Sequence, residues 1–189
     1  TIQQDRGRMN KYDIITFQCF TQEQVKEINR EIKKNITEKE KLSKSAQNVS
    51  KIGEFCHVPC ILLGELIHPW LYQCQIANRN SFGYDIYWDF HLETLNYNVY
   101  GVGGEYGWHI DTNSAFLTPL DSKLTCLLNL SEETYEGGEF YTICDPNKKV
   151  EFTSGEGLII NSLIAHKVTP VTKGERITLT FWAHGPSWR

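Results

Sequence analysis

The sequence predicts a mainly β protein, a β-sandwich or jelly roll whose sheet is covered by N-terminal α-helices. From residue 84 onward, apolar residues alternate with a period of two, and turn-forming residues separate eight short candidate strands. Before residue 84, apolar residues recur with the period of an α-helix instead. The 189 residues, 40% hydrophobic and 22% charged, suit one globular domain. We therefore expect a single domain over 1–189, with mainly helical support in 1–83 and a jelly-roll core in 84–189.

The first helix is predicted to begin just after Thr21. Thr21 and Gln24 have the spacing of a capping box, and Phe20 and Val25 have that of a hydrophobic staple. Apolar residues then follow at helical intervals, at Val25, Ile28, Ile32 and Ile36.

A polar loop and a second helical segment are predicted before the strands begin. The loop covers residues 37–53, and the helical segment covers residues 60–78. Pro69 lies within this segment, where it either kinks the helix or begins a new one.

Eight strands are predicted in the second half of the chain. They cover residues 88–100, 107–111, 123–130, 139–143, 149–152, 157–161, 166–168 and 175–183. Within the first of them the apolar parity changes, and a bulge or break near residues 93–94 would explain the change. Turn signals separate the strands at Thr118-Pro119, Gly137-Gly138, Asp145-Pro146-Asn147 and Lys173-Gly174.

Charge and composition argue against several classes of protein. The net charge of −4, without a basic stripe, disfavours a nucleic-acid binder. No apolar run approaches the roughly 20 residues that a membrane helix needs, and no secretory signal stands at the start of this sequence. The six cysteines include no C-x-x-C pair, which is typical of reduced thiols in an intracellular, cytoplasmic protein.

A glycine-rich stretch, "NVYGVGGEYGWHID", leads into a possible metal-binding pair. Its glycines fit no phosphate-binding motif, so we interpret the stretch as a tight connection between two strands. His109 and Asp111 are two residues apart, and on a strand they would project to the same side. The pair could chelate a divalent metal, or it could be an ordinary histidine beside an aspartate.

His166 is the best candidate for a third ligand. It follows the apolar run "GLIINSLIAH" and precedes "KVTPV", so it stands at the edge of a strand. Two histidines and one carboxylate form the facial triad of non-heme Fe(II) oxygenases, which leaves coordination sites open. The lack of a cysteine ligand argues against a structural zinc site.

Arg176 lies in an otherwise apolar strand and needs a partner. It shares one face of this strand with Thr178 and Thr180. The arginine could form a salt bridge at the strand end, with Glu175 or Glu139. It could instead bind the carboxylate of a ligand through both arms of its guanidinium group, with Thr178 assisting.

Several stretches of the sequence resemble a known family. "YGVGGEYGWHID" is similar to the stretch that precedes H-x-D in collagen-type prolyl hydroxylases. "LLNLSEETYEGGEF", "HKVTPVTKGERITLTFW" and "HGPSWR" resemble bacterial and phage hydroxylases. The resemblance, over about residues 95–189, is to the prolyl 4-hydroxylase-type Fe(II)/2-oxoglutarate-dependent dioxygenases.

The resemblance implies a fold and a set of site residues. The fold would be a double-stranded β-helix, a cupin-like jelly roll covered by N-terminal helices. His109, Asp111 and His166 would hold Fe(II), with no other catalytic residue. The cosubstrate 2-oxoglutarate would chelate the metal, and its far carboxylate would meet Arg176, where collagen-type enzymes use lysine. The same resemblance implies further cosubstrate contacts by Thr178, Thr180, Tyr100 and Asn129, and a pocket lined by Tyr106, Trp108 and Trp182. For Trp182, a plain core position is the alternative.

The resemblance also implies an activity. The enzyme would hydroxylate a C–H bond, above all in a prolyl residue of a peptide or protein, while 2-oxoglutarate and O₂ become succinate and CO₂. Ascorbate could serve as the reductant. The alternatives are the same chemistry on a free amino acid or another residue, a non-catalytic metal-binding jelly-roll module, and a zinc-dependent hydrolase or isomerase on a similar barrel.

Overall fold

The computed structural model describes residues 14–36, 43–44, 51–87, 94–111 and 120–188. Within these ranges, antiparallel strands form a seven-stranded sheet, a five-stranded sheet and a small ribbon. The seven-stranded sheet has the order β1 (Ile15–Gln18), β11 (Glu156–Asn161), β7 (Leu120–Asn129), β14 (Arg176–Pro186), β5 (Thr94–Tyr100), β4 (Glu54–Pro59) and β2 (Ser43–Lys44). The five-stranded sheet has the order β10 (Asp145–Val150), β9 (Phe140–Thr142), β12 (His166–Val168), β6 (Glu105–His109) and β3 (Lys51–Ile52), and the ribbon pairs β13 (Val171–Lys173) with β8 (Glu136–Gly137).

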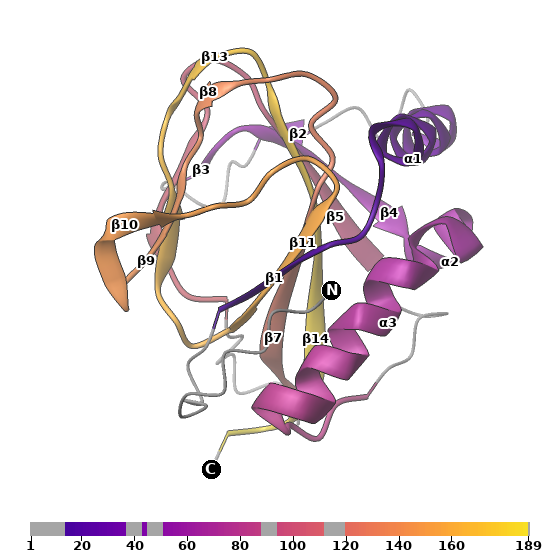
Figure 1. Ribbon diagram of the computed structural model, residues 1–189, viewed down its shortest axis with the longest axis vertical. Coiled ribbons are helices and arrows are strands. Elements are labelled where there is room, and N and C mark those ends of the chain that lie inside the picture. Colours follow the sequence, from indigo (N-terminus) through magenta and orange to yellow (C-terminus); the bar gives the residue numbers. More distant parts are fainter. Residues whose placement is uncertain (1–13, 37–42, 45–50, 88–93, 112–119, 189) are drawn as a thin grey trace.

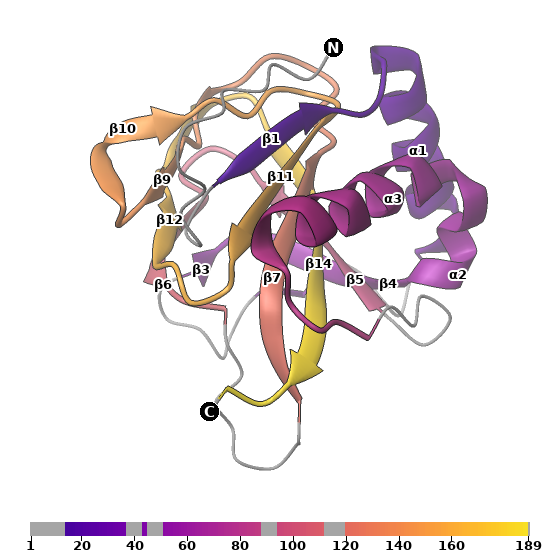
Figure 2. The same ribbon diagram turned by 60° about the horizontal axis from the view of Figure 1, so that its bottom comes forward.

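The two larger sheets face each other as a jelly roll, and Figure 1 looks into the space that they enclose. The predicted fold class, mainly β with helices on one side, is confirmed. The helical elements lie over the seven-stranded sheet, as Figure 2 shows. They are α1 (Gln22–Asn35), α2 (Cys60–Leu63), the 3₁₀ helix η2 (Gly64–Ile67), α3 (His68–Ala77) and the π-helical turn η3 (Asn78–Phe82).

Local sequence explains where these helices begin. Thr21 caps α1: its hydroxyl accepts a hydrogen bond from the Gln24 amide, and its own amide donates to the Gln24 side chain. The predicted capping box is therefore confirmed. Pro69 stands in the first turn of α3 and begins a new helix there. None of the helices in the described ranges is long and apolar enough to cross a membrane.

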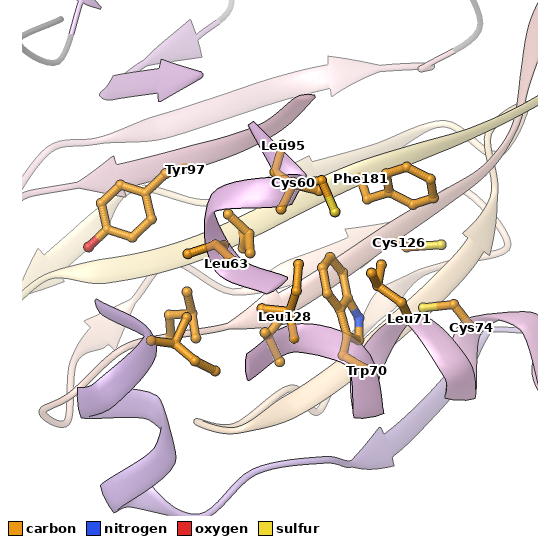
Figure 3. Packing of buried hydrophobic residues seen from close by; sticks show 14 of the residues in the cluster. Cys60, Leu63, Trp70, Leu71, Cys74, Leu95, Tyr97, Cys126, Leu128 and Phe181 are labelled. Atoms are coloured by element: carbon orange, nitrogen blue, oxygen red, sulfur yellow. The ribbon is translucent and has the colours of Figure 1, made fainter. Parts of the chain in front are cut away.

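The seven-stranded sheet has apolar side chains on both faces, because strand residues alternate between the two sides. Its outer face packs against the helices in the larger apolar cluster. Figure 3 shows Trp70, Leu71 and Cys74 of α3 directed toward Cys126 and Leu128 of β7. The inner face contributes to a smaller cluster between the sheets, formed by Leu127, Phe140, Phe152, Leu158, Ile160 and Val168.

Several element predictions were wrong or incomplete. The sequence interpretation placed no strand before residue 84, yet β1 and β4 lie there and extend the seven-stranded sheet. β4 alternates Cys56 and Val58 toward the helices, but it is too short to stand out from its helical surroundings. The turn predicted at residues 145–147 is part of β10, because the chain turns at residues 143–144 instead.

Other predictions lie wholly or partly outside the described residues. These are the start of the strand over 88–100 with its parity change, the turn at Thr118-Pro119, and most of the loop over 37–53.

The glycine-rich stretch is the tight connection between β5 and β6 that the sequence predicts. Gly103 has a positive φ of 81°, a conformation that residues with a Cβ rarely adopt. A Cβ on Gly104 would lie 2.8 Å from the carbonyl oxygen of Gly101. The Gly104 carbonyl accepts a hydrogen bond from the Val171 amide, so the turn is also tied to β13.

Candidate metal centre

His109, Asp111 and His166 come together at the paired ends of β6 and β12. His166 is opposite His109 in the ladder, and Asp111 lies two residues beyond the end of β6. His109 Nε2 lies 3.5 Å from Asp111 Oδ1, and His166 Nε2 lies 3.4 Å from Asp111 Oδ2. One ligand atom from each residue falls within 4.8 Å of the other two, so the three side chains could hold one metal ion.

Hydrogen bonds fix the orientation of each side chain. His109 Nδ1 lies 2.7 Å from the Gly107 carbonyl oxygen, and His166 Nδ1 lies 2.9 Å from that of Ile164. Both Nδ1 atoms must therefore carry the proton, which leaves the Nε2 lone pairs for a metal. The Thr125 hydroxyl donates to Asp111 Oδ2 at 2.8 Å and holds that carboxylate.

The ionisation of the site also suits metal binding. Burial, with a smaller effect from nearby His166, lowers the pKa of His109 to about 4. Burial alone would raise the pKa of Asp111. The interactions of Asp111 with protonated His166, helped by His109 and Thr125, outweigh burial and bring that pKa to about 2. At neutral pH the site therefore offers a neutral imidazole beside a carboxylate, the forms that coordinate metals.

An extra residue in β6 decides which side chains face the site. Between two paired positions β12 advances by two residues, from His166 to Val168, whereas β6 advances by three, from His109 to Tyr106. This bulge turns both Tyr106 and His109 inward, and their rings stack with centroids 3.5 Å apart. Trp108 instead lies outside, 43% exposed and beneath the Lys167 ammonium group. Tyr106 thus lies beside the candidate ligands, whereas Trp108 points away from them, and the pocket roles expected for both stay predictions.

Arg176 lies on the inner face of β14, together with Thr178, Thr180 and Trp182. It is 2% exposed, and its Nε has no hydrogen-bond partner among the described residues. The salt bridge considered from the sequence is not formed with Glu139, which pairs with Lys149 instead. Arg176 is therefore a buried cation, with no ion pair in the described part of the chain.

A cavity of about 750 Å³ reaches Arg176, with Gly138, Phe140 and Phe152 also in its wall. The three candidate metal ligands do not line it. Arg176 and these ligands are connected through β14 instead. Its Trp182 pairs with Thr125 of β7, and the Thr125 hydroxyl donates a hydrogen bond to Asp111. The Trp182 ring nitrogen is buried and has no hydrogen-bond partner among the described residues.

Tyr100 and Asn129 differ in what they can offer a ligand. The Tyr100 ring is buried beside Arg176, whose Cζ lies 5.5 Å from its centroid. Asn129 is fully buried and already bonded. Its amide group donates to the Phe152 carbonyl and the Tyr135 hydroxyl, and its Oδ1 accepts from the Ser131 amide. Asn129 therefore holds two loops with its present hydrogen bonds, and its expected contact with a cosubstrate stays a prediction.

Sequence interpretation missed three residues of the site. Thr125 and Asn98 could have been found, because strand alternation puts them on the inner faces of β7 and β5. No pattern in the sequence indicated that Lys51 belongs to the site, since it stands in a stretch that was expected to be a polar loop. Its ammonium group lies near the rings of Phe55 and Tyr106. Burial lowers the pKa of Lys51 to about 8, against the opposing effect of Asp111.

Comparisons with known proteins agree with this geometry. Residues 95–184 match the model of the 2OG-Fe(II) oxygenase superfamily. A PKHD-type hydroxylase of Stutzerimonas stutzeri (strain A1501) is 36% identical over 94 residues, which cover 46% of this chain and 41% of that protein. A PKHD-type hydroxylase of Stenotrophomonas maltophilia (strain R551-3) is 38% identical over 92 residues, 46% of this chain and 40% of that protein. The chain thus spans about two fifths of the length of these relatives.

Solved structures show the same fold over nearly the whole chain. A prolyl-4-hydroxylase of Pseudomonas putida superposes with a TM-score of 0.69 at 17% identity, covering 93% of this chain and 94% of that one. The viral collagen prolyl hydroxylase of Paramecium bursaria Chlorella virus-1, in its 2OG complex, gives 0.67 at 17% identity, covering 93% and 97%. Residues 95–184 are therefore similar to the 2OG-Fe(II) oxygenase superfamily and to PKHD-type hydroxylases, and the chain shares the fold of these solved prolyl hydroxylases.

Proposed function

We propose that the protein is an Fe(II)/2-oxoglutarate-dependent dioxygenase that hydroxylates a C–H bond, in the first place that of a prolyl residue in a peptide or protein. One oxygen atom of O₂ would enter the substrate as a hydroxyl group, and the other would enter succinate as 2-oxoglutarate loses CO₂. The observation that carries the proposal is the cluster of His109, Asp111 and His166, in which both Nε2 atoms face one carboxylate while the two Nδ1 atoms face backbone carbonyl oxygens.

The donor set of this cluster fits Fe(II). Two imidazoles and one carboxylate are the ligands of non-heme iron oxygenases, and they leave positions open for a 2-oxo acid and O₂. When bound, the iron and its cosubstrate supply the oxidising chemistry, while the protein supplies geometry and a shielded site. The stacked Tyr106 ring and the Thr125 hydroxyl hold His109 and Asp111 in place.

Arg176 fits the far carboxylate of 2-oxoglutarate. A buried guanidinium group without an ion pair is costly, and a bound carboxylate would compensate it with two charge-assisted hydrogen bonds. Thr178 and Thr180 lie further along the same face of β14, in the direction of Trp182. We assign Arg176, Thr178, Thr180 and Tyr100 to the cosubstrate pocket, and Tyr106 and Trp182 to its walls.

The choice of a prolyl substrate is supported by the fold and by the names of similar proteins. One similar structure, with a TM-score of 0.67 and 17% identity over 92% of this chain and 83% of that one, is a prolyl hydroxylase from Trichoplax adhaerens. It is in complex with a hypoxia inducible factor peptide fragment. A peptide or protein is therefore the substrate class that we propose.

Two further proposals concern the chain as a whole. We propose that residues 1–189 act as one domain, because β1, β4 and β2 pair in the same sheet as the later strands. We also propose an intracellular location, supported by six cysteines that are all free thiols.

Mass spectrometry of a peptide library would test the reaction. The library would be incubated with the protein, Fe(II), 2-oxoglutarate and ascorbate as reductant. We expect a gain of one oxygen on proline-containing peptides, coupled to succinate. Oxidation of other residues alone would contradict the prolyl assignment. The absence of both oxidised peptide and succinate would contradict the enzymatic function itself.

A further inference from the structure

Lys51 joins the two sheets at one edge of the jelly roll. It stands on β3, the last strand of the five-stranded sheet, and its side chain reaches β5 of the other sheet. Its Nζ lies 2.7 Å from Asn98 Oδ1 and 5.9 Å from the centroid of the Tyr100 ring. Arg176 lies over the same ring, at 5.5 Å. Lys51 is thus part of the wall beside the proposed cosubstrate pocket.

The contact with Lys51 determines the orientation of Asn98. An ammonium group can only donate hydrogen bonds, so the Asn98 amide must present its oxygen to Lys51. Its nitrogen then points the other way, toward Thr180 Oγ1 at 3.1 Å and the Asn96 carbonyl oxygen at 3.2 Å. All three polar contacts of this amide group therefore depend on one orientation.

The orientation of Asn98 also determines in which direction the Thr180 hydroxyl can donate a hydrogen bond. A hydroxyl group has one hydrogen to donate. Because Thr180 Oγ1 accepts a hydrogen from Asn98, its own hydrogen cannot be directed at that partner. Thr180 is almost fully buried on the inner face of β14, four residues after Arg176. Its hydrogen is available to an oxygen atom in the space between the sheets.

We infer that Lys51 is a positioning residue for the cosubstrate: through Asn98 it makes the Thr180 hydroxyl a hydrogen-bond donor to 2-oxoglutarate. The inference rests on the proposed function and adds a residue from the opposite sheet to its machinery. Lys51 acts here through Asn98 and is not a catalytic residue.

We call the contacts from Lys51 through Asn98 to Thr180 the relay. A double-mutant cycle tests this relay without any turnover. The affinity for 2-oxoglutarate would be measured by calorimetry on protein loaded with Mn(II), for wild type, Lys51→Met, Thr180→Val and the double variant. We expect Lys51→Met to weaken binding about five- to tenfold, as for one lost hydrogen bond. In the Thr180→Val background, Lys51→Met should change the affinity for 2-oxoglutarate by less than about twofold, because the hydroxyl group that the relay orients is absent.

Matched variants separate this effect from general damage. Lys33→Met removes an exposed lysine that pairs with Glu132, and it should leave the affinity unchanged. Lys51→Arg keeps donors at the same place and should restore most of the binding. Thermal unfolding followed by circular dichroism would show whether each variant folds, and Asn98→Leu would replace Lys51→Met in the cycle if that variant does not.

The outcomes distinguish the relay from the proposed function. Equal weakening by Lys51→Met in both backgrounds would overturn the relay, as would unchanged binding by Lys51→Met alone. Wild-type protein that binds Mn(II) but no 2-oxoglutarate would contradict the proposed function instead.

Discussion

At the scale of single residues, the three candidate ligands are held by their surroundings before any metal arrives. Carbonyl oxygens of Gly107 and Ile164 fix the two imidazoles, and Thr125 fixes the carboxylate. Burial keeps His109 neutral at pH 7, although Asp111 is close to it. This arrangement lowers the cost of ordering the ligands when a metal binds.

The ionisation of His109 predicts a pH dependence of the metal-free protein. Its folded pKa of about 4 lies below the ordinary histidine value, so between about pH 6.5 and pH 4 the unfolded chain binds more protons. The free energy of unfolding should therefore fall as the pH falls through this window, by up to about 3 kcal/mol. At lower pH, between the ordinary pKa of an aspartate and about 2, protonation of Asp111 should reduce the free energy of unfolding further.

Urea unfolding at a series of pH values, in the presence of a chelator, would measure this loss. His109→Gln should flatten the dependence between pH 6.5 and pH 4. His68→Gln, a change at an exposed residue of α3, should keep the wild-type slope. A slope in His109→Gln equal to that of wild type would contradict the assignment.

Site residues could be predicted from the sequence where the alternation of strand residues shows which side chains lie on the same face. His109, Asp111, His166 and Arg176 were identified because their types and spacing are unusual for buried strands. Trp108 directly precedes His109, so strand alternation by itself directs the two side chains to opposite sides. The bulge in β6, which brings Tyr106 to the side of His109, is not marked in the sequence. Lys51 was missed because its partner Asn98 lies 47 residues further along the chain.

At the scale of elements, the helices stabilise the seven-stranded sheet, which presents Arg176. Trp70 of α3 is fully buried and packs in the larger cluster with Leu128. A Cβ on Gly157 of β11 would come within 3.1 Å of the Trp70 ring, which shows how closely α3 approaches the sheet. Capping signals and Pro69 predicted these helices well, because they act within a few residues. The short strand β4 depends on pairing with β5, and such long-range pairing leaves little trace in the local sequence.

The packing of α3 predicts a large effect of one substitution. Trp70→Ala should lower the free energy of unfolding by about 3–5 kcal/mol, because it leaves a cavity in the core. Tyr72→Ala removes a ring of the same helix that is 57% exposed, and it should cost less than about 1 kcal/mol. Urea denaturation would measure both variants. A small loss for Trp70→Ala would show that α3 contributes little to the stability of the sheet.

At the scale of the whole molecule, the two sheets contribute different parts of the proposed site. The five-stranded sheet supplies His109, His166 and Lys51, and the seven-stranded sheet supplies Arg176 and Thr180. A cosubstrate bound to both the metal and Arg176 would therefore bridge the sheets. The jelly roll itself could be predicted from the alternating strands, whereas the contribution of the first 83 residues to its main sheet could not.

On the proposed function, one metal ion and one 2-oxoglutarate molecule occupy the space between the two sheets together. The direct test is an anaerobic titration of 2-oxoglutarate into Fe(II)-loaded protein, followed by the visible charge-transfer absorption of an iron-bound 2-oxo acid. We predict saturable absorption for wild type and for His68→Ala, no iron binding for His166→Ala, and retained iron with at least tenfold weaker 2-oxoglutarate binding for Arg176→Leu. Wild-type protein that holds iron but develops no absorption, or Arg176→Leu with unchanged affinity, would contradict the claim.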